Sequence, residues 1–165
     1  PGKKLNFMGN EIGQFREWDE ERVQDWDLIK YPFHDAFHHY YAELCKLYAK
    51  EKALYDGEYN RECFEWLEIH AKQFSTYVYA RKGGGEVIIT ALNLSDQFWK
   101  DFTFGIWKGA RLVELLNSDW ECYGGQTKPE DDNCHVLPEE YNGKEARAVV
   151  DLAPFSARIF KVSWE

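Results

Sequence analysis

The sequence predicts a mainly β protein, in which an antiparallel β sandwich follows a short strand, a loop and one helix. Two observations carry this prediction. After residue 57, short apolar or alternating runs recur between turn residues at about the 8–12-residue spacing of a sandwich. Before it, apolar residues recur at steps of three and four over residues 34–52, which indicates an amphipathic helix.

The chain opens with a short apolar run. Residues 5–8 are β-prone and end at Gly9, as in a buried parallel strand, and a carboxylate-rich segment follows over residues 11–27. α/β barrels build their sites on loops at the carboxyl ends of such strands. A strand and a helix alone cannot bury their apolar faces. We therefore expect residues 1–54 to have belonged to a (β/α)8 barrel, and the abrupt start at Pro1 to be a cut through a larger protein.

Seven strands are expected in the second domain, residues 55–165. Their ranges are 63–68, 74–81, 86–93, 98–106, 111–116, 146–152 and 157–164. Glycines 83–85 supply the positive φ angles for a hairpin between the second and third strands. In the fourth, the even-numbered residues from Phe98 to Ile106 should share one mainly apolar face, with Trp99 on the other. Residues 124–143 form a polar loop, longer than the common limit of about 12–15 residues and so expected to be functional or mobile.

Composition excludes several classes of partner. The net charge of −9, with Lys and Arg scattered, argues against nucleic acid and anionic membranes. No apolar run approaches the ~20 residues of a membrane span. The four cysteines form no C-x-x-C pair, which favours free thiols in a reducing compartment and hence a cytoplasmic location. They are Cys45, Cys63, Cys122 and Cys134.

Three groups of residues suggest chemistry, and each has a plainer explanation. The loop acids invite a glycosidase pair, which retaining enzymes hold about 5–5.5 Å apart, but charged loop residues are usually solvated. These acids are Glu11, Glu17, Asp19, Glu20, Glu21, Asp25 and Asp27. His34 and His38, with His39 beside them, have metal-ligand spacing, but position 35 is Asp and no third ligand is evident, so surface or packing histidines are favoured.

Aromatic residues make up 17% of the chain and are the third group. Aromatic rings fill cores and also stack on sugar rings. A possible sugar-stacking platform, for which core or sheet packing is the favoured alternative, consists of Trp99, Trp107, Trp120 and Tyr123.

One stretch resembles a known family closely. Residues 4–18 read KLNFMGNEIGQFREW, followed by EER at 20–22 and DW at 25–26. This resembles the segment around the eighth barrel strand of bacterial glycogen branching enzymes, members of the α-amylase superfamily. Related amylases and debranching enzymes carry Gly-Glu-Glu where this chain has Gly9-Asn10-Glu11. Further matches are YPFH at 31–34, ALY at 53–55, FEW at 64–66, LNSD at 116–119 and YGG at 123–125, whereas residues 126–143 match nothing in the family.

The resemblance implies a reaction that transfers an α-1,4-glucan segment to a 6-hydroxyl, forming α-1,6 branches in glycogen. In the family the nucleophile, the acid/base and the stabilising aspartate all lie upstream of residues 5–8, so no catalytic residue is expected in this chain and it should be inactive alone. No cofactor and no metal are implied. The substrate-binding residues that the resemblance suggests are Asn10, Glu11, Gln14, Arg16, Glu17 and Trp18.

The expected partners are an α-1,4-glucan such as glycogen or amylose and the missing N-terminal barrel of the same protein. By resemblance, residues 55–165 are an all-β C-terminal domain of α-amylase type with a mainly structural role. Two alternatives remain: a non-catalytic glucan-binding β module, and the tail of another α-amylase superfamily hydrolase, either debranching or trehalose-forming.

Overall fold

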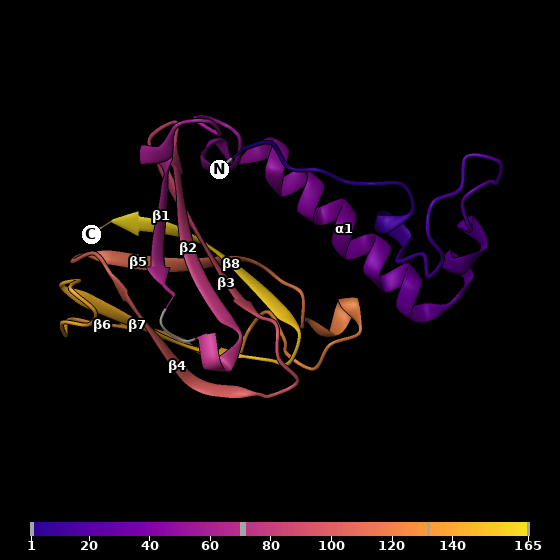
Figure 1. The fold of residues 1–165 in the computed structure, drawn as a ribbon. Coiled ribbons are helices and arrows are strands. Elements are labelled where there is room, and N and C mark those ends of the chain that lie inside the picture. The colour runs from indigo at the N-terminus through magenta and orange to yellow at the C-terminus, as the bar shows by residue number, and fades with distance from the viewer. Residues whose placement is uncertain (1, 70–71, 132, 165) are drawn as a thin grey trace.

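The structure, a computed structural model, describes residues 2–69, 72–131 and 133–164. In these ranges eight strands form two antiparallel sheets. The strands are β1 (Phe64–Glu68), β2 (Thr76–Gly83), β3 (Glu86–Asn93), β4 (Trp99–Ile106), β5 (Ala110–Asn117), β6 (Cys134–Leu137), β7 (Ala146–Leu152) and β8 (Ser156–Trp164). The larger sheet has the order β1-β2-β3-β8-β5 and the smaller β4-β7-β6, and Figure 1 shows them stacked as two layers. The predicted β sandwich is confirmed.

The main core lies between the two sheets. Val78, Ile89 and Phe160 from the larger sheet pack with Phe104 and Val150 from the smaller, and each of these side chains is at most 1% exposed. In β7 every second residue is buried, as the alternation of a sandwich strand requires. Full burial of one such apolar side chain is worth about 1.5–3 kcal/mol, so this core is the main stabilising element of the domain.

The strand bounds agree closely with the prediction, and one strand was missed. β3 and β7 begin and end at the predicted residues, and the other five predicted strands differ by at most two residues at either end. The missed strand, β6, lies inside the expected loop 124–143 and pairs with β7. Its four residues are too few to show a period. Because a strand occupies its middle, the expectation of one long loop was wrong.

The predicted faces of β4 were also partly wrong. A bulge shifts its register with β7 between Trp99 and Phe102. Asp101 has φ 54° in this bulge, and its N–H donates to Asp151 Oδ1 at 2.8 Å. The extra residue inverts the alternation before it. Trp99 therefore packs against the core together with Phe102 and Phe104, instead of facing away from them.

A second apolar cluster attaches the helical part to the outer face of the larger sheet. Helix α1 (Pro32–Lys50), close to the predicted range 34–52, is followed by the 3₁₀ helix η3 (Lys52–Leu54). Buried Ala53 and Leu54 pack on the sheet, and residues of the later part of α1 pack beside them. The sheet residues are Ile88, Leu116 and Ile159, and the α1 residues are Tyr40, Leu44, Leu47 and Tyr48.

An ion-pair cluster reinforces this attachment. Lys161 Nζ lies 2.6 Å from Glu51 Oε2 and 2.8 Å from Glu86 Oε1. The other Glu86 oxygen accepts the N–H of Lys52 at 2.8 Å. The carboxylates of Glu51 and Glu86 raise the pKa of Lys161. One cation on β8 thus links the end of α1 to β3.

The strand expected over residues 5–8 is not formed. No described strand lies beside it, and Leu5 is 86% exposed and Phe7 51%. A parallel strand needs neighbours to accept and donate its backbone hydrogen bonds. Among the described residues no strand is placed to supply them, so the predicted strand does not form. Pro1, where a cut was expected, lies outside the described residues.

A carboxylate anchors the beginning of the chain instead. The buried Glu58 pairs with Lys3 Nζ at 2.9 Å and Lys4 Nζ at 3.1 Å, and Tyr48 O–H donates to its Oε1 at 2.7 Å. The backbone N–H of Gly2 also donates to Glu58 O at 2.6 Å. Interaction with Lys3, then with the Tyr48 hydroxyl and Lys4, lowers the pKa of Glu58 to about 2.

A buried arginine joins the two sheets and the segment before β6. Arg158 on β8 is 2% exposed. Its Nε donates to Glu114 Oε1 at 2.6 Å, and its two terminal nitrogens donate to Asp151 O and to Asn133 Oδ1, each at 2.8 Å. A buried guanidinium is tolerated because these acceptors satisfy it.

The first prediction concerns Glu58. Because its pKa in the folded chain is below the ordinary 4.5, its stabilising effect is complete above pH 4.5 and is lost as the pH falls toward 2. We expect Glu58→Gln to lower the denaturation midpoint at pH 7, with the difference from wild type shrinking below pH 4.5. Urea titrations at several pH values measure this, with the exposed Glu62→Gln as control. An unchanged difference at pH 3 would contradict the ion-pair explanation.

The second prediction concerns Arg158. Arg158→Ala leaves Glu114 without its cation. It also removes the donor to the backbone oxygen of Asp151 and to the side-chain oxygen of Asn133. We expect a loss of about 3–5 kcal/mol in the free energy of unfolding, the range for breaking a buried pair. The control, Glu114→Gln, keeps an acceptor oxygen for Arg158 and should lose less. Guanidinium denaturation compares the two, and equal losses would show that the charge of Glu114 accounts for the whole effect.

Candidate functional site

The six predicted site residues lie in one bend at the end of the molecule far from the sandwich. This N-terminal segment (residues 2–31) folds back on itself beside the beginning of α1 (Figure 1). Gly9 and Gly13, with φ 87° and 62°, flank the 3₁₀ helix η1 (Asn10–Ile12). A Cβ on Gly9 would lie 2.9 Å from Gln14, so only glycine allows this close return. Between the glycines, Ile12 is completely buried.

Two histidines of α1 hold η1 in place. His34 Nδ1 lies 2.7 Å from Ile12 O, and His38 Nδ1 lies 3.0 Å from Glu11 O. Rings pack against them as well, Phe15 on His34 and Trp26 on His38. Both imidazoles are thus used in packing and in capping backbone carbonyls, as the favoured interpretation of these histidines had it.

Arg16 and Gln14 form the centre of the bend. Arg16 Nε donates to both carboxylate oxygens of Asp25, at 3.0 and 2.9 Å, and its Nη2 donates to Val23 O. Gln14 Oε1 accepts the N–H of Asp25 at 2.9 Å. Asp25 is therefore the organising acid of the loop. Asp25 could not be distinguished from the other loop acids in advance, because its partner Arg16 lies nine residues away in the chain.

Asn10 and Glu11 sit side by side on η1 but differ in exposure and bonding. Asn10 is exposed, whereas Glu11 Oε2 accepts from Asn6 Nδ2 at 3.0 Å. This hydrogen bond is the main reason why the pKa of Glu11 is lowered. A general acid needs a raised pKa to hold its proton near neutral pH. Glu11 is thus suited to accept hydrogen bonds and not to protonate a leaving group.

Glu17 and Trp18 follow Arg16 in the bend. The Trp18 ring, 44% exposed, meets Phe7 edge-on with centroids 5.8 Å apart. Glu17 is exposed. The structure therefore brings Gln14 and Arg16 together through Asp25, and places Glu17 and Trp18 further along the bend. Near Asp25, a cavity of about 520 Å³ is lined by Val23, Gln24, Asp25, Trp26, Asp27, Leu28 and Tyr31.

The edge of the larger sheet carries an aromatic surface that the sequence analysis missed. We call it the aromatic platform, and it consists of Phe64, Trp66, Tyr77 and Tyr79. Phe64 and Tyr79 stack at 5.4 Å, and Trp66 is 49% exposed. A cavity of about 710 Å³ beside it is lined by Tyr59, Arg61, Phe64, Glu65 and Trp66. The FEW motif at residues 64–66 could have indicated this surface, because residues two apart on a strand, here Phe64 and Trp66, share a face.

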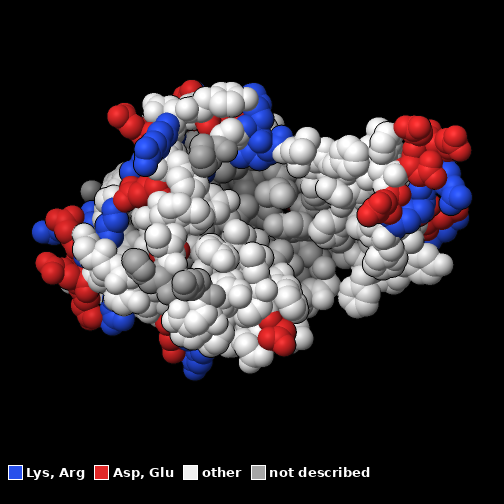
Figure 2. Space-filling view, in the orientation of Figure 1, with Lys and Arg blue, Asp and Glu red and all other residues white. Residues whose placement is uncertain are grey.

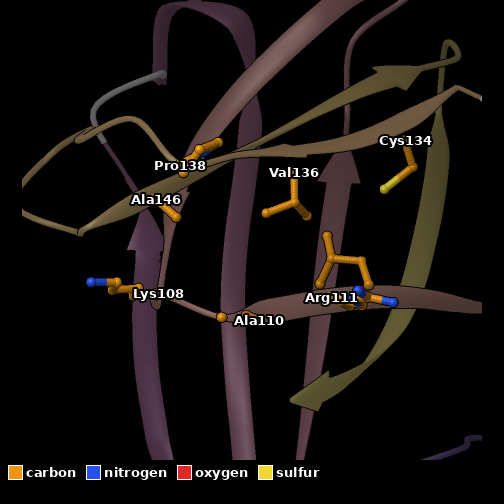
Figure 3. Close-up of a pocket in the computed structure, with 9 residues that line it drawn as sticks. Lys108, Ala110, Arg111, Cys134, Val136, Pro138 and Ala146 are labelled. Carbon is orange, nitrogen blue, oxygen red and sulfur yellow. The ribbon is translucent and has the colours of Figure 1, made fainter. Parts of the chain in front are cut away.

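The four aromatics proposed from the sequence do not form one platform. Trp99 and Trp107 pack against the sandwich core, whereas Trp120 and Tyr123 stack at 6.2 Å and pack with the α1 cluster. Packing is therefore their main role. An open cavity of about 450 Å³ between the edges of β5 and β6 is also lined without an aromatic ring, and Figure 3 shows Val136 pointing into it from β6.

The charged residues form no single-sign surface on the face shown in Figure 2. Red and blue side chains alternate at the tip of the N-terminal segment and around the sandwich, with uncharged surface between them. None of the helices among the described residues has the length and apolar character that a bilayer crossing needs.

Comparison with known proteins identifies the β domain and its relatives. The family model for the alpha amylase C-terminal all-beta domain matches residues 66–163. The 1,4-alpha-glucan branching enzyme GlgB of Protochlamydia amoebophila is 35% identical over 99% of this chain and 22% of its own length. The enzyme of the same name from Aquifex aeolicus is also 35% identical, over 99% of this chain and 24% of its own length.

The chain thus spans less than a quarter of the length of these relatives. The solved isomaltulose synthase SmuA from Protaminobacter rubrum resembles 85% of this chain and 20% of its own, with a TM-score of 0.50 and 15% identity, a likeness that bears on the fold alone. Because the all-β model covers more than half of the residues, and the sandwich has the matching architecture, this chain belongs to the alpha amylase C-terminal all-beta domain family.

Proposed function

We propose that this chain is the C-terminal part of a 1,4-α-glucan branching enzyme, a glycosyltransferase whose catalytic carboxylates lie on polypeptide upstream. The alignments with enzymes of that name extend over 98–100% of the chain. They therefore include the N-terminal segment as well as the β domain. The parent would transfer an α-1,4-glucan segment to a 6-hydroxyl, and this part alone would be inactive.

The observation that carries the proposal is the exposed apolar surface of the N-terminal segment. Soluble monomers seldom expose large contiguous apolar patches, so such a surface indicates a partner. Its members, all at least 48% exposed, are Leu5, Phe7, Met8, Phe15, Val23 and Phe33. Residues 5–8 also have no described strand beside them, and a neighbouring parallel strand would complete them. A barrel of the same protein is the partner that fits both facts.

The site residues would then line the rim of a glucan cleft. Asn10, Glu17 and Trp18 are exposed and can offer an amide, a carboxylate and a ring face to a sugar. Gln14 and Arg16 are bound to Asp25, so their first role would be to hold the bend in shape. Glu11 would accept a hydrogen bond from a sugar hydroxyl. A tail of a debranching or trehalose-forming hydrolase has less support, because the relatives named above are branching enzymes.

The proposed location is the cytoplasm. All four cysteines are free thiols, two of them exposed, as a reducing compartment allows. A branching enzyme in the cytoplasm would share that compartment with its substrate, a storage glucan.

The aromatic platform supports a second function, weak binding of glucan by the β domain itself. Trp66 presents about half of its surface to solvent on a rigid strand, fixed by contacts with Tyr77 and Tyr79 at 6.4 and 5.8 Å. A preorganised exposed ring of this kind stacks on a pyranose without losing much side-chain freedom.

The third prediction tests the parent reaction by complementation. The chain alone should leave the iodine colour and the branch ends of amylose unchanged, and adding the upstream polypeptide of the parent should restore branching. Phe15→Asp places a charge in the proposed interface and should lower the restored activity at least about tenfold, equivalent to about 1.4 kcal/mol. Val113→Asp, which places the same charge at an exposed apolar position on the sandwich, is the control. Branching by the chain alone would overturn the proposal.

The fourth prediction tests the aromatic platform. In native gels containing glycogen, the chain should migrate more slowly than in plain gels, and Trp66→Ala should lose most of this retardation. Loss of one aromatic contact should weaken binding about 2- to 10-fold. Trp164→Ala removes another exposed tryptophan outside the platform and should migrate like wild type. If both variants behave alike, the platform is not the binding surface.

A further inference from the structure

A further pocket, distant in sequence from the N-terminal segment, lies where the two sheets meet at one edge. It has a volume of about 470 Å³ and lies between the end of β1 and the beginning of β4. The 3₁₀ helix η5 (Lys72–Phe74) borders it on one side and the turn at Asn142 on the other. We call it the bulge pocket, because both strands that border it are irregular there.

The irregularities hold the pocket open. β1 shifts register with β2 between Trp66 and Glu68, and β4 shifts with β7 at Asp101. Asp101 and Asn142, which both line the pocket, have positive φ angles of 54° and 48°. Aspartate and asparagine adopt this left-handed conformation more readily than other residues with a side chain, which suits them to these two positions.

One wall of the pocket is aromatic. The rings of Phe74 and Trp99 approach to 4.6 Å between centroids. Trp99 Nε1 donates to Ser95 Oγ at 3.1 Å, which fixes the indole. Phe74 remains 36% exposed. The two ring planes are tilted by 57°, so Trp99 supports Phe74 from the core side and the exposed part of Phe74 offers an apolar face to the pocket.

Polar groups surround this wall. Glu68 is only 4% exposed although it lines the pocket, and its Oε2 accepts from Asn142 Nδ2 at 2.7 Å. Gln73 adds an amide, and Asp101 adds a carboxylate beside Lys100. Two carboxylates disfavour an anionic ligand, and the mixture of amide donors and carboxylate acceptors around an aromatic wall suits the hydroxyls of a neutral sugar.

We propose that the bulge pocket binds a glucose ring of an α-glucan chain, with the ring stacked on Phe74, which Trp99 supports, and its hydroxyls bonded to Glu68, Asp101 and Asn142. The contacts described above support a sugar-binding site at this pocket. The choice of an α-glucan as the ligand rests on the proposed function. The pocket is separate from the aromatic platform, since the two share no lining residue.

Titration of the chain with maltoheptaose, followed by ¹⁵N–¹H NMR, tests the proposal. We expect a Kd of about 1 mM and shifts of the amides of Gln73, Phe74, Asp101 and Asn142 and of the Trp99 indole N–H. Phe74→Ala should raise that Kd about 2- to 10-fold. Trp164→Ala, which removes an exposed tryptophan that lines neither the bulge pocket nor the aromatic platform, should leave these shifts unchanged.

Asp101→Asn is the second variant, because asparagine tolerates the positive φ while losing the charge. Asp101→Asn should also weaken maltoheptaose binding. If Phe74→Ala fails to fold, the Kd of Asp101→Asn is the measurement that tests the proposed site. Sorbitol, which has hydroxyls but no ring face, should shift none of these signals. Absence of shifts at about 10 mM maltoheptaose, shifts confined to the platform, or equal shifts with sorbitol would each overturn the proposal. Because the titration uses this chain alone, its outcome does not depend on whether the chain completes a barrel.

Discussion

The larger sheet buries apolar side chains on both of its faces, and the position of the whole helical part depends on this. Consecutive residues point to opposite faces, so Ile88 and Ile89 on β3, like Ile159 and Phe160 on β8, serve two different cores. An antiparallel sheet commonly leaves one face to water, but this one cannot. The end of α1 and η3 must therefore cover it, and the beginning of α1 is directed away from the sandwich as a support for the N-terminal segment.

Strand and helix periodicity predicted most of the fold, and the exceptions have physical causes. The alternation in β3 and β7 is uninterrupted, so even their ends could be predicted. β6 has too few residues for a period, and its pairing with β7 depends on contacts distant in sequence, including that of Arg158 with Asn133. The bulge depends on the positive φ of Asp101, and an aspartate in a strand-like run does not by itself predict a positive φ. Residues 5–8 have the composition of a strand, but no strand in the described part of the chain lies beside them.

The candidate site was predictable only as far as chain neighbours lie close together. The residues from Asn10 to Trp18 share one bend because they are consecutive, and the glycines on either side of η1 signal that bend. Their partners could not be predicted, because the pairing of Arg16 with Asp25 depends on how the loop closes. The aromatic platform was missed for a related reason: Trp66 meets Tyr79 through the register of β1 and β2, which becomes known only when the strands are paired.

The anchor at Glu58 has a consequence for how such proteins can change. Lys3 and Lys4 at the entry of the helical part and Glu58 at its exit meet at one point, so the polypeptide between them forms a closed excursion from the sandwich. A closed excursion can lengthen, shorten or be exchanged whole without moving the place where it joins. Recombination between relatives that exchanged this unit would have to carry with it the two lysines, the acid and the apolar residues of α1 and η3 that cover the larger sheet.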